Sequence, residues 1–287
     1  MTALARPSAS APRRPRLLRY PSLAVGGAIA TVVIGMALLS LVWTPYSLMA
    51  MNMRQRLQAP SLQHLLGTDQ FGRDLLSLLM IGAQNSLAVG VVAVVIGLVI
   101  GTALGLLAAA RRGWVDEVVM RFCDFVFAFP AVLSAVMLAA ALGPGTGNAM
   151  LAIGIYNIPI FARIARGAAK SVWAREFVTA ARTAGKGIIR ISVEHVLPNI
   201  LNIIVVQATI SFATAVLAEA ALSYLGLGTQ PPAPSWGRML HESQTFLSRA
   251  AYLSIIPGLT IVVTVLGLNL LGDGLRDLLD PRQSAER

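Results

Sequence analysis

The chain has 287 residues, of which 56% are hydrophobic and only 13% are charged. Its mean hydropathy is +0.70. Soluble domains carry about 25% charged residues, so this composition excludes an ordinary soluble protein. The formal net charge of +10 is typical of the basic cytoplasmic loops of membrane proteins, and it therefore requires no nucleic-acid partner.

The apolar residues are gathered into runs near or above the ~20 residues that cross a bilayer. The alternation of period two that a membrane β-barrel needs is absent. The sequence therefore predicts an all-α polytopic membrane protein with six transmembrane helices. The expected spans are residues 22–43, 85–110, 118–142, 149–164, 199–225 and 251–271.

Residues 1–20 carry five arginines among Pro, Ala and Ser, which predicts a disordered basic cytoplasmic tail. The apolar run that follows is too long for a signal peptide. Residues 74–80, between the first two spans, are expected to form a short amphipathic helix on the membrane surface. Pro130 lies near the middle of the third span, and a kink is expected at Pro159 in the fourth.

Three glycines, Gly97, Gly101 and Gly105, lie on one face of the second span. Small residues at this spacing predict close approach of a neighbouring helix. The pattern indicates helix packing, and it carries no functional prediction.

The placement of basic residues sets the orientation of the spans. With the amino terminus inside, 18 of the 23 Lys and Arg residues fall in cytoplasmic segments, Arg121 included, and five fall on the other side. The positive-inside rule therefore predicts that both termini are cytoplasmic. It also places residues 163–199, which we call the polar loop, inside the cell.

The polar loop contains seven basic residues and a short predicted helix, residues 176–184. Phe177, Ala180, Ala181 and Ala184 share one face of this helix by helical periodicity. Glu176 in the first turn suits the helix dipole, and Gly185 suits the carboxy-terminal cap. The alanine face favours docking onto another protein, but a helix folded back on its own chain fits the same pattern.

Two acidic residues, Asp124 and Glu219, lie within apolar runs, where carboxylates mark functional sites or structural pairs. Asp124 is about 6 Å from the cytoplasmic end of its span, near Arg121. Glu219 is about 30 Å beyond Pro198, close to the external interface. Both are candidates for lining a translocation pathway, and an ion-coupled secondary transporter would use them to carry protons.

No metal site or catalytic set is predicted. The single cysteine, Cys123, cannot form an intrachain disulfide, and the three histidines lack ligand spacing. The only Gly-Lys pair, 185–186, lacks the other residues of a P-loop. The chain is therefore not expected to be an enzyme, to hydrolyse ATP alone or to bind a cofactor.

The polar loop resembles the cytoplasmic EAA loop of ABC-importer permeases, whose pattern is EAA, three residues, Gly, nine residues and I-x-L-P. Ala180, Ala181, Gly185, Leu197 and Pro198 match this pattern. Thr179 stands at the motif glutamate, and His195 stands at the motif isoleucine. GTDQFGRD, AEAALSYLGLG, PPAPSWG and LGDGLRDLLDPR, between residues 67 and 282, are similar to the second-type permease of the dipeptide, oligopeptide and nickel importer group.

This resemblance implies a permease subunit that forms half of a translocation pathway for peptides or related solutes. Its implied partners are a homologous permease, two cytoplasmic ATPases that hold ATP-Mg, and an extracytoplasmic solute-binding protein, all at a bacterial cytoplasmic membrane. The implied permease domain spans residues 21–282, with a core of five spans in 84–272 and a tail at 283–287. The residues to which it assigns ATPase coupling are Arg175, Glu176, Phe177, Ala180, Ala181, Gly185, Leu197 and Pro198.

Overall fold

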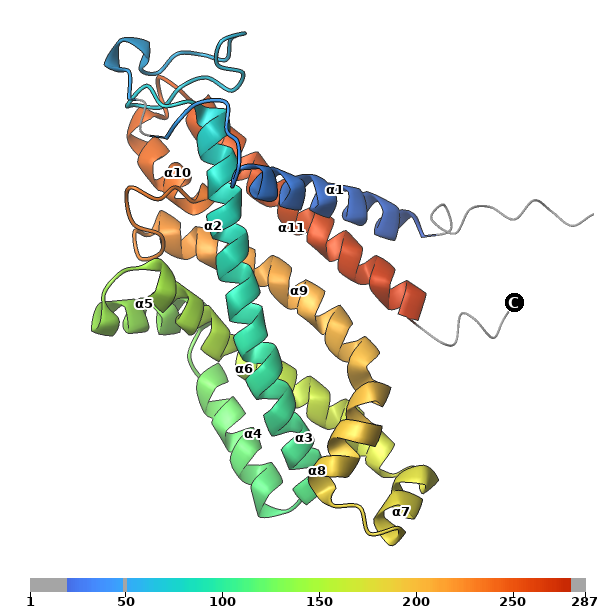
Figure 1. Ribbon diagram of the computed structural model, residues 1–287. Coiled ribbons are helices and arrows are strands. Elements are labelled where there is room, and N and C mark those ends of the chain that lie inside the picture. Colours follow the sequence, from blue (N-terminus) through green and yellow to red (C-terminus); the bar gives the residue numbers. More distant parts are fainter. Residues whose placement is uncertain (1–19, 49–50, 280–287) are drawn as a thin grey trace, which may run out of the picture.

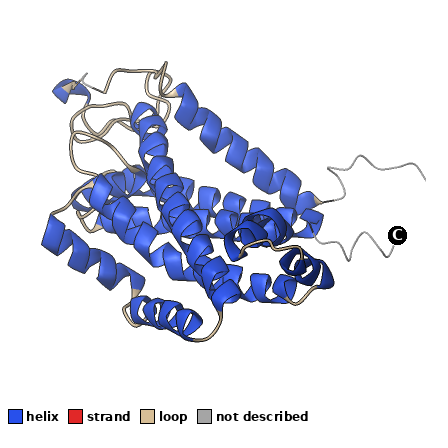
Figure 2. Cartoon of the chain, turned by 60° about the horizontal axis from the view of Figure 1, so that its bottom comes forward, coloured by secondary structure: helices blue, strands red, loops and turns tan. Residues whose placement is uncertain are grey.

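The computed structural model describes residues 20–48 and 51–279. The predicted tails at 1–20 and 283–287 therefore lie outside the described residues, except for Tyr20. Within the described part, the regular structure is helical apart from one isolated bridge between Thr68 and Asp74, and Figure 2 shows these helices joined by loops. The long helices are α1 (Pro21–Leu39), α2 (Leu75–Ile96), α6 (Thr146–Trp173), α9 (Leu197–Tyr224) and α11 (Tyr252–Leu279).

Shorter helices complete the fold. They are η2 (Met53–Gln55), η3 (Gly97–Gly101), α3 (Thr102–Arg111), α4 (Trp114–Phe127), α5 (Ala131–Leu142), α7 (Glu176–Thr183), α8 (Ile188–Ile191), η4 (Ser192–Val196), α10 (Trp236–Ser243) and η5 (Gln244–Phe246). Among the described residues, five helical segments are long and apolar enough to cross a membrane, and α4 with α5 makes a sixth span if this bent pair is counted as one.

The second span is longer than the sequence predicted. α2, η3 and α3 form one helical segment over Leu75–Arg111, so residues 75–80 are its first turns and the predicted surface helix over 74–80 is wrong. Asp74 caps this segment, because its carboxylate accepts a hydrogen bond from the Ser77 backbone N–H at 2.8 Å. A capped start at residue 75 lengthens the span by about three turns.

The third span is not the single helix predicted over 118–142. α4 and α5 meet at an angle of 84°, and the break falls just before Pro130, the residue that precedes α5. Proline lacks a backbone N–H and disfavours helical geometry in the residue before it. Pro159 has a different effect, since α6 runs through it without interruption.

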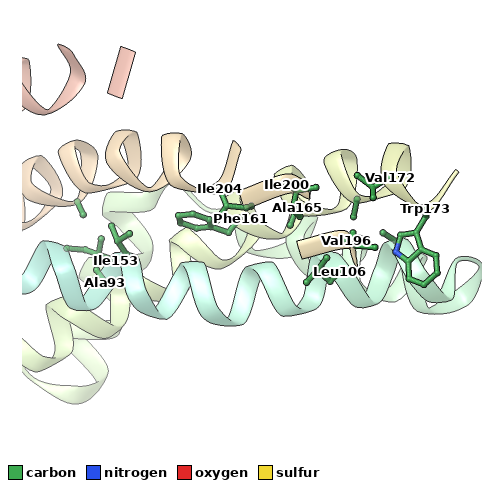
Figure 3. Close-up of a cluster of buried hydrophobic side chains, with 14 of the residues drawn as sticks. Ala93, Leu106, Ile153, Phe161, Ala165, Val172, Trp173, Val196, Ile200 and Ile204 are labelled. Carbon is green, nitrogen blue, oxygen red and sulfur yellow. The ribbon is translucent and has the colours of Figure 1, made fainter. Parts of the chain in front are cut away.

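The buried apolar side chains form two main clusters that share α2 and α9. One joins the carboxy-terminal half of α2 to α3, α6 and α7, and to α9 from Ile200 to Leu222. Figure 3 shows part of it, with Phe161 and Ala165 of α6 near Ile200 and Ile204 of α9. The other joins α1, α10 and α11 to the amino-terminal half of α2 and the second half of α9. Figure 1 shows α1 and α11 side by side.

The glycine ladder of the second span packs on α6, as predicted. A Cβ atom on Gly101 would lie 2.3 Å from the Ile158 carbonyl oxygen, and one on Gly105 would lie 2.4 Å from the Ala162 carbonyl oxygen. The two backbones therefore approach so closely that no larger residue fits between them.

We expect Gly101→Leu to lower the free energy of unfolding by about 1–3 kcal/mol, because overpacking forces α2–α3 away from α6. Thermal unfolding of the detergent-solubilised protein measures this effect. Gly35→Leu on α1 is the matched control, since a Cβ there meets nothing within 4 Å. Equal melting temperatures for the two variants would contradict tight packing at Gly101.

The two ends of the bundle differ. At one end, residues 51–74 and 225–251 form a compact unit that we call the loop lobe, and α7 lies at the other end (Figure 1). In the loop lobe, Arg73 pairs with Asp69 at 2.6 Å and Arg238 pairs with Glu242 at 2.8 Å. The Tyr252 hydroxyl donates to the carbonyls of Gln58 and Thr68 at 2.9 Å. The ion pairs lie within the loop lobe, and the Tyr252 hydrogen bonds hold it on the start of α11.

Candidate functional site

The short helix α7 ends as the sequence predicted. Gly185 adopts a φ of +81°, which a residue without a Cβ reaches at no steric cost. Its N–H donates to the Arg182 carbonyl at 2.9 Å, and the Lys186 N–H donates to the Ala181 carbonyl at 3.1 Å. This pair of bonds is a Schellman motif, and it fixes the direction in which the chain leaves α7.

The predicted alanine face of α7 is divided in the structure. Val178 and Ala181 are buried against the chain's own core, so this part of the helix folds back on its own protein. Ala180 and Ala184 are exposed, and Phe177 is 41% exposed. Both interpretations of the sequence therefore apply, each to one side of the helix: one side anchors α7 and the other remains accessible.

A polar network fixes the chain on the carboxy-terminal side of α7. Glu194 accepts hydrogen bonds from Lys186 at 2.7 Å and Arg190 at 2.6 Å. His195, at the motif isoleucine position, lies 3.0 Å from the Lys186 ammonium, and its ring is 6.3 Å from the Phe177 ring. Glu194 was not among the predicted site residues, although its i,i+4 spacing from Arg190 is the sequence signal that could have revealed it.

Leu197 and Pro198 lie where the polar loop joins α9. Pro198 occupies the first turn of α9 as predicted, but helical structure already begins at Ile188 and passes through the π-helical turn η4. A proline inside a helix removes one hydrogen bond and clashes with the carbonyl four residues earlier. The wider π turn just before Pro198 is consistent with relief of that clash.

Asp124 on α4 pairs with Arg163 on α6, with 2.5 Å between the carboxylate and guanidinium. The sequence placed it near Arg121, but Arg121 pairs with Glu117 instead, at 3.6 Å. The Arg163 guanidinium also lies over the Phe127 ring, 4.6 Å from its centroid. The side chains of Asp124 and Arg163 remain 53% and 43% exposed, so this ion pair lies on the surface of the bundle.

Glu219 on α9 is enclosed by its own chain and has no exposed surface, so it lines no surface of this subunit. Its carboxylate accepts hydrogen bonds from Ser86 of α2 at 2.8 Å and from Ser223 at 2.6 Å. Thr229, in the loop before α10, lies 3.5 Å away. Glu219 thus connects two membrane helices to the loop lobe, which favours the structural interpretation over pathway lining.

Five of the seven basic residues of the polar loop form ion pairs, with two carboxylates of α4 and with Glu194 of the loop itself. Arg166 and Lys170 of α6 both bind Asp116 of α4, and the pairs of Arg163, Lys186 and Arg190 are described above. Arg175, which precedes the first residue of α7, and Arg182, in its last turn, are exposed and form no ion pair with another described residue. The two basic residues of the polar loop that form no ion pair therefore both lie at α7.

Residues 101–285 match the family model of the binding-protein-dependent transport system inner membrane component. The chain belongs to this family. A dipeptide transport system permease protein of Alkalihalophilus pseudofirmus is 44% identical over 91% of this chain and 86% of its own length. A glutathione transport system permease protein of Escherichia coli is 45% identical over 78% of this chain and 74% of its own length.

A solved structure supports the same fold. The inward-facing MetNI methionine ABC transporter contains a chain that matches 71% of this protein with a TM-score of 0.59 and 21% identity, and 96% of that chain is covered. This permease-family chain is therefore a multi-pass membrane subunit of an ABC importer. The ion-coupled secondary transporter, which the sequence left open, gains no support from these comparisons.

Proposed function

We propose that this permease forms half of the pathway of an ATP-driven importer and that a homologous permease subunit forms the other half. Two cytoplasmic ATPases, which carry the ATP-Mg, would bind at the α7 end of the bundle. The support is the divided surface of α7, which Val178 anchors in the core while Phe177 and Ala180 stay accessible. A helix held on one side and free on the other can transmit movement from a docked protein.

The eight residues that the resemblance assigned to coupling then divide into two groups. Phe177 and Ala180 would contact the ATPase, with Arg175 and Glu176 beside them at the helix start. Ala181, Gly185, Leu197 and Pro198 would hold α7 in position, because Ala181 is buried and the other three shape the chain after the helix.

The orientation follows from the same proposal. The α7 end would face the cytoplasm, together with both termini, and the loop lobe would face an extracytoplasmic solute-binding protein across a bacterial cytoplasmic membrane. The solutes would be peptides or related small molecules, since relatives of this chain are named as dipeptide and glutathione permeases. The chain itself would bind no cofactor and perform no catalysis.

Asp124 is the residue that we propose for the pathway. It is charged and half-exposed on a predominantly apolar bundle, and a carboxylate within an apolar span marks a functional site or a structural pair. Glu219, which is fully enclosed, is assigned to holding the loop lobe in place.

The test is reconstitution of the permease with its companion permease, ATPases and binding protein in liposomes, with radiolabelled dialanine and glutathione as probes. We expect uptake of at least one probe that requires ATP and persists when an ionophore collapses the proton gradient. Uptake by the purified chain alone, without nucleotide, would contradict the proposal.

A further inference from the structure

A hollow of about 590 Å³ lies between the end of α3 and the chain that follows α7. Arg111 of α3 lines it on one side, and Arg190, Val193 and Glu194 line it on the other. Figure 1 shows α8 beside the end of α3. The volume falls within the range of about 300–1,000 Å³ that is usual for small-molecule sites. The proposed function makes no use of this hollow.

The hollow lies where two membrane-spanning segments end. The segment Leu75–Arg111 finishes at Arg111, and the segment Ile188–Tyr224 begins at Ile188. Trp114, three residues after Arg111, is 75% exposed, and tryptophan is enriched at membrane–water interfaces. An arginine at the end of an apolar span also extends its charge into the headgroup layer. Lipid headgroups are therefore expected at the level of the hollow.

The hollow carries an excess of positive charge. Arg111 is exposed and forms no ion pair or hydrogen bond with another described residue. Glu194 is offset by two cations, since it accepts hydrogen bonds from Lys186 at 2.7 Å and from Arg190 at 2.6 Å. The Arg190 bond uses the Nε–H, and a guanidinium has five N–H donors. The other donors of both arginines can therefore bind an anion.

Apolar side chains continue from these charged groups along the two membrane segments. Ile189 and Val193, one helical turn apart, are 80% and 56% exposed. Leu107, one turn before Arg111 on α3, is 42% exposed, and residues four apart share a helix face. The surface thus joins a basic rim to exposed apolar groups, which matches a ligand with an anionic head and hydrocarbon tails.

We propose that this hollow binds an anionic phospholipid of the surrounding membrane. The guanidiniums of Arg111 and Arg190 would bind the phosphate, because the planar fork of arginine matches its oxygens. The acyl chains would lie along Leu107 and Val193. Basic pockets between membrane helices bind anionic headgroups in this way. The lipid would belong to the cytoplasmic leaflet, and this last placement alone rests on the proposed function, through its orientation of the α7 end.

A neighbouring hollow on α4 has the opposite charge balance. Its charged lining residues are Arg121, Arg166, Asp116, Glu117 and Asp124, so three carboxylates face two guanidiniums. Arg121 pairs with Glu117, and Arg166 pairs with Asp116. An anionic headgroup would be repelled there, so positive charge distinguishes the hollow at Arg111 from its neighbour.

The experiment measures lipid affinity by native mass spectrometry, on the detergent-purified permease and on the assembled importer. Dioleoyl phosphatidylglycerol is the anionic probe, and dioleoyl phosphatidylcholine is the zwitterionic one. We expect wild type to bind phosphatidylglycerol more tightly than phosphatidylcholine. Arg111→Gln should weaken the binding of phosphatidylglycerol about fivefold, because one basic residue near an anionic lipid contributes about this much. Arg111 is exposed, so the substitution should leave the melting temperature unchanged.

Arg112→Gln is the matched control, since Arg112 is exposed but does not line the hollow. Its affinity for phosphatidylglycerol should stay within about twofold of wild type. Equal losses in the two variants would indicate attraction by general surface charge and would overturn the site. Equal affinities of wild type for the two lipids would overturn it as well.

Two further outcomes concern what occupies the hollow. Displacement of the lipid by equimolar inorganic phosphate would indicate a site for free phosphate, and binding to the permease but not to the assembled importer would show that a companion subunit covers the hollow. Either result would overturn the proposal. An importer that transports no solute but binds phosphatidylglycerol through Arg111 would support the lipid site and contradict the proposed function.

Discussion

Ala180→Asp should abolish ATP-driven uptake while the protein still folds and inserts into the membrane. Ala180 is exposed on α7 and its side chain does not pack in the core. A charge there therefore stays in water and costs no desolvation free energy within the subunit. In a docked interface the same charge would be desolvated without a partner, at a cost of several kcal/mol. Uptake into liposomes and co-purification of the ATPases measure the effect, and we expect a loss of at least about a hundredfold in uptake.

Two variants of the same helix separate docking from folding. Thr179→Glu places an acid at the exposed motif position where the family pattern has glutamate, and it should preserve uptake. Val178→Asp should instead reduce the amount of folded protein, because Val178 has no exposed surface and an ionised group there would be buried without a partner. Normal uptake by Ala180→Asp would show that this face of α7 does not carry the coupling.

Glu219→Ala should produce the largest loss of stability among the acidic residues. The substitution leaves the hydroxyl groups of Ser86 and Ser223 without their buried acceptor, and each unsatisfied group costs about 1–3 kcal/mol. If the free energy of unfolding falls by about 3 kcal/mol in all, the melting temperature in detergent should fall by about 6–12 °C. Differential scanning fluorimetry of the purified protein measures this shift.

Glu219→Gln and Glu117→Ala complete the comparison. Glutamine retains an acceptor oxygen and should recover part of the lost stability, whereas Glu117 is exposed and its removal should leave the melting temperature unchanged. If Glu219→Ala melted like wild type but lost uptake, Glu219 would belong to the pathway and our structural assignment would be wrong.

The sequence predicted helices well where one physical rule dominates. Long apolar runs identified the membrane helices, and the close approach of α3 to α6 followed from the spacing of Gly101 and Gly105. The start of α2 was missed because Asn85 and its polar neighbours suggested a boundary. In the structure the Asn85 side chain donates to the Pro234 carbonyl at 2.6 Å, so its polarity is satisfied by a residue far away in the chain.

The candidate site was predicted only in its local parts. The helix cap at Gly185 depends only on neighbouring residues, so it could be predicted directly from the sequence. The partners of Asp124 and Glu219 could not, because Arg163 and Ser86 lie 39 and 133 residues away in sequence. Trp236 was missed for the same reason: it is fully buried, and its indole N–H donates to the Leu79 carbonyl at 3.1 Å, a contact that no periodicity indicates.

The sharing of α9 between the two apolar clusters has a mechanical consequence. Ile200 and Ile204 near its start belong to the cluster that holds α7, while Val216 and Ala220 belong to the cluster beneath the loop lobe. An uninterrupted helix is stiff along its axis, so a shift imposed on the first pair of residues is carried as a tilt or translation to the second pair, about 24 Å away at 1.5 Å per residue. α9 therefore links the end of the subunit that carries α7 to the end that carries the loop lobe, and a movement of α7 would reach the loop lobe through this helix.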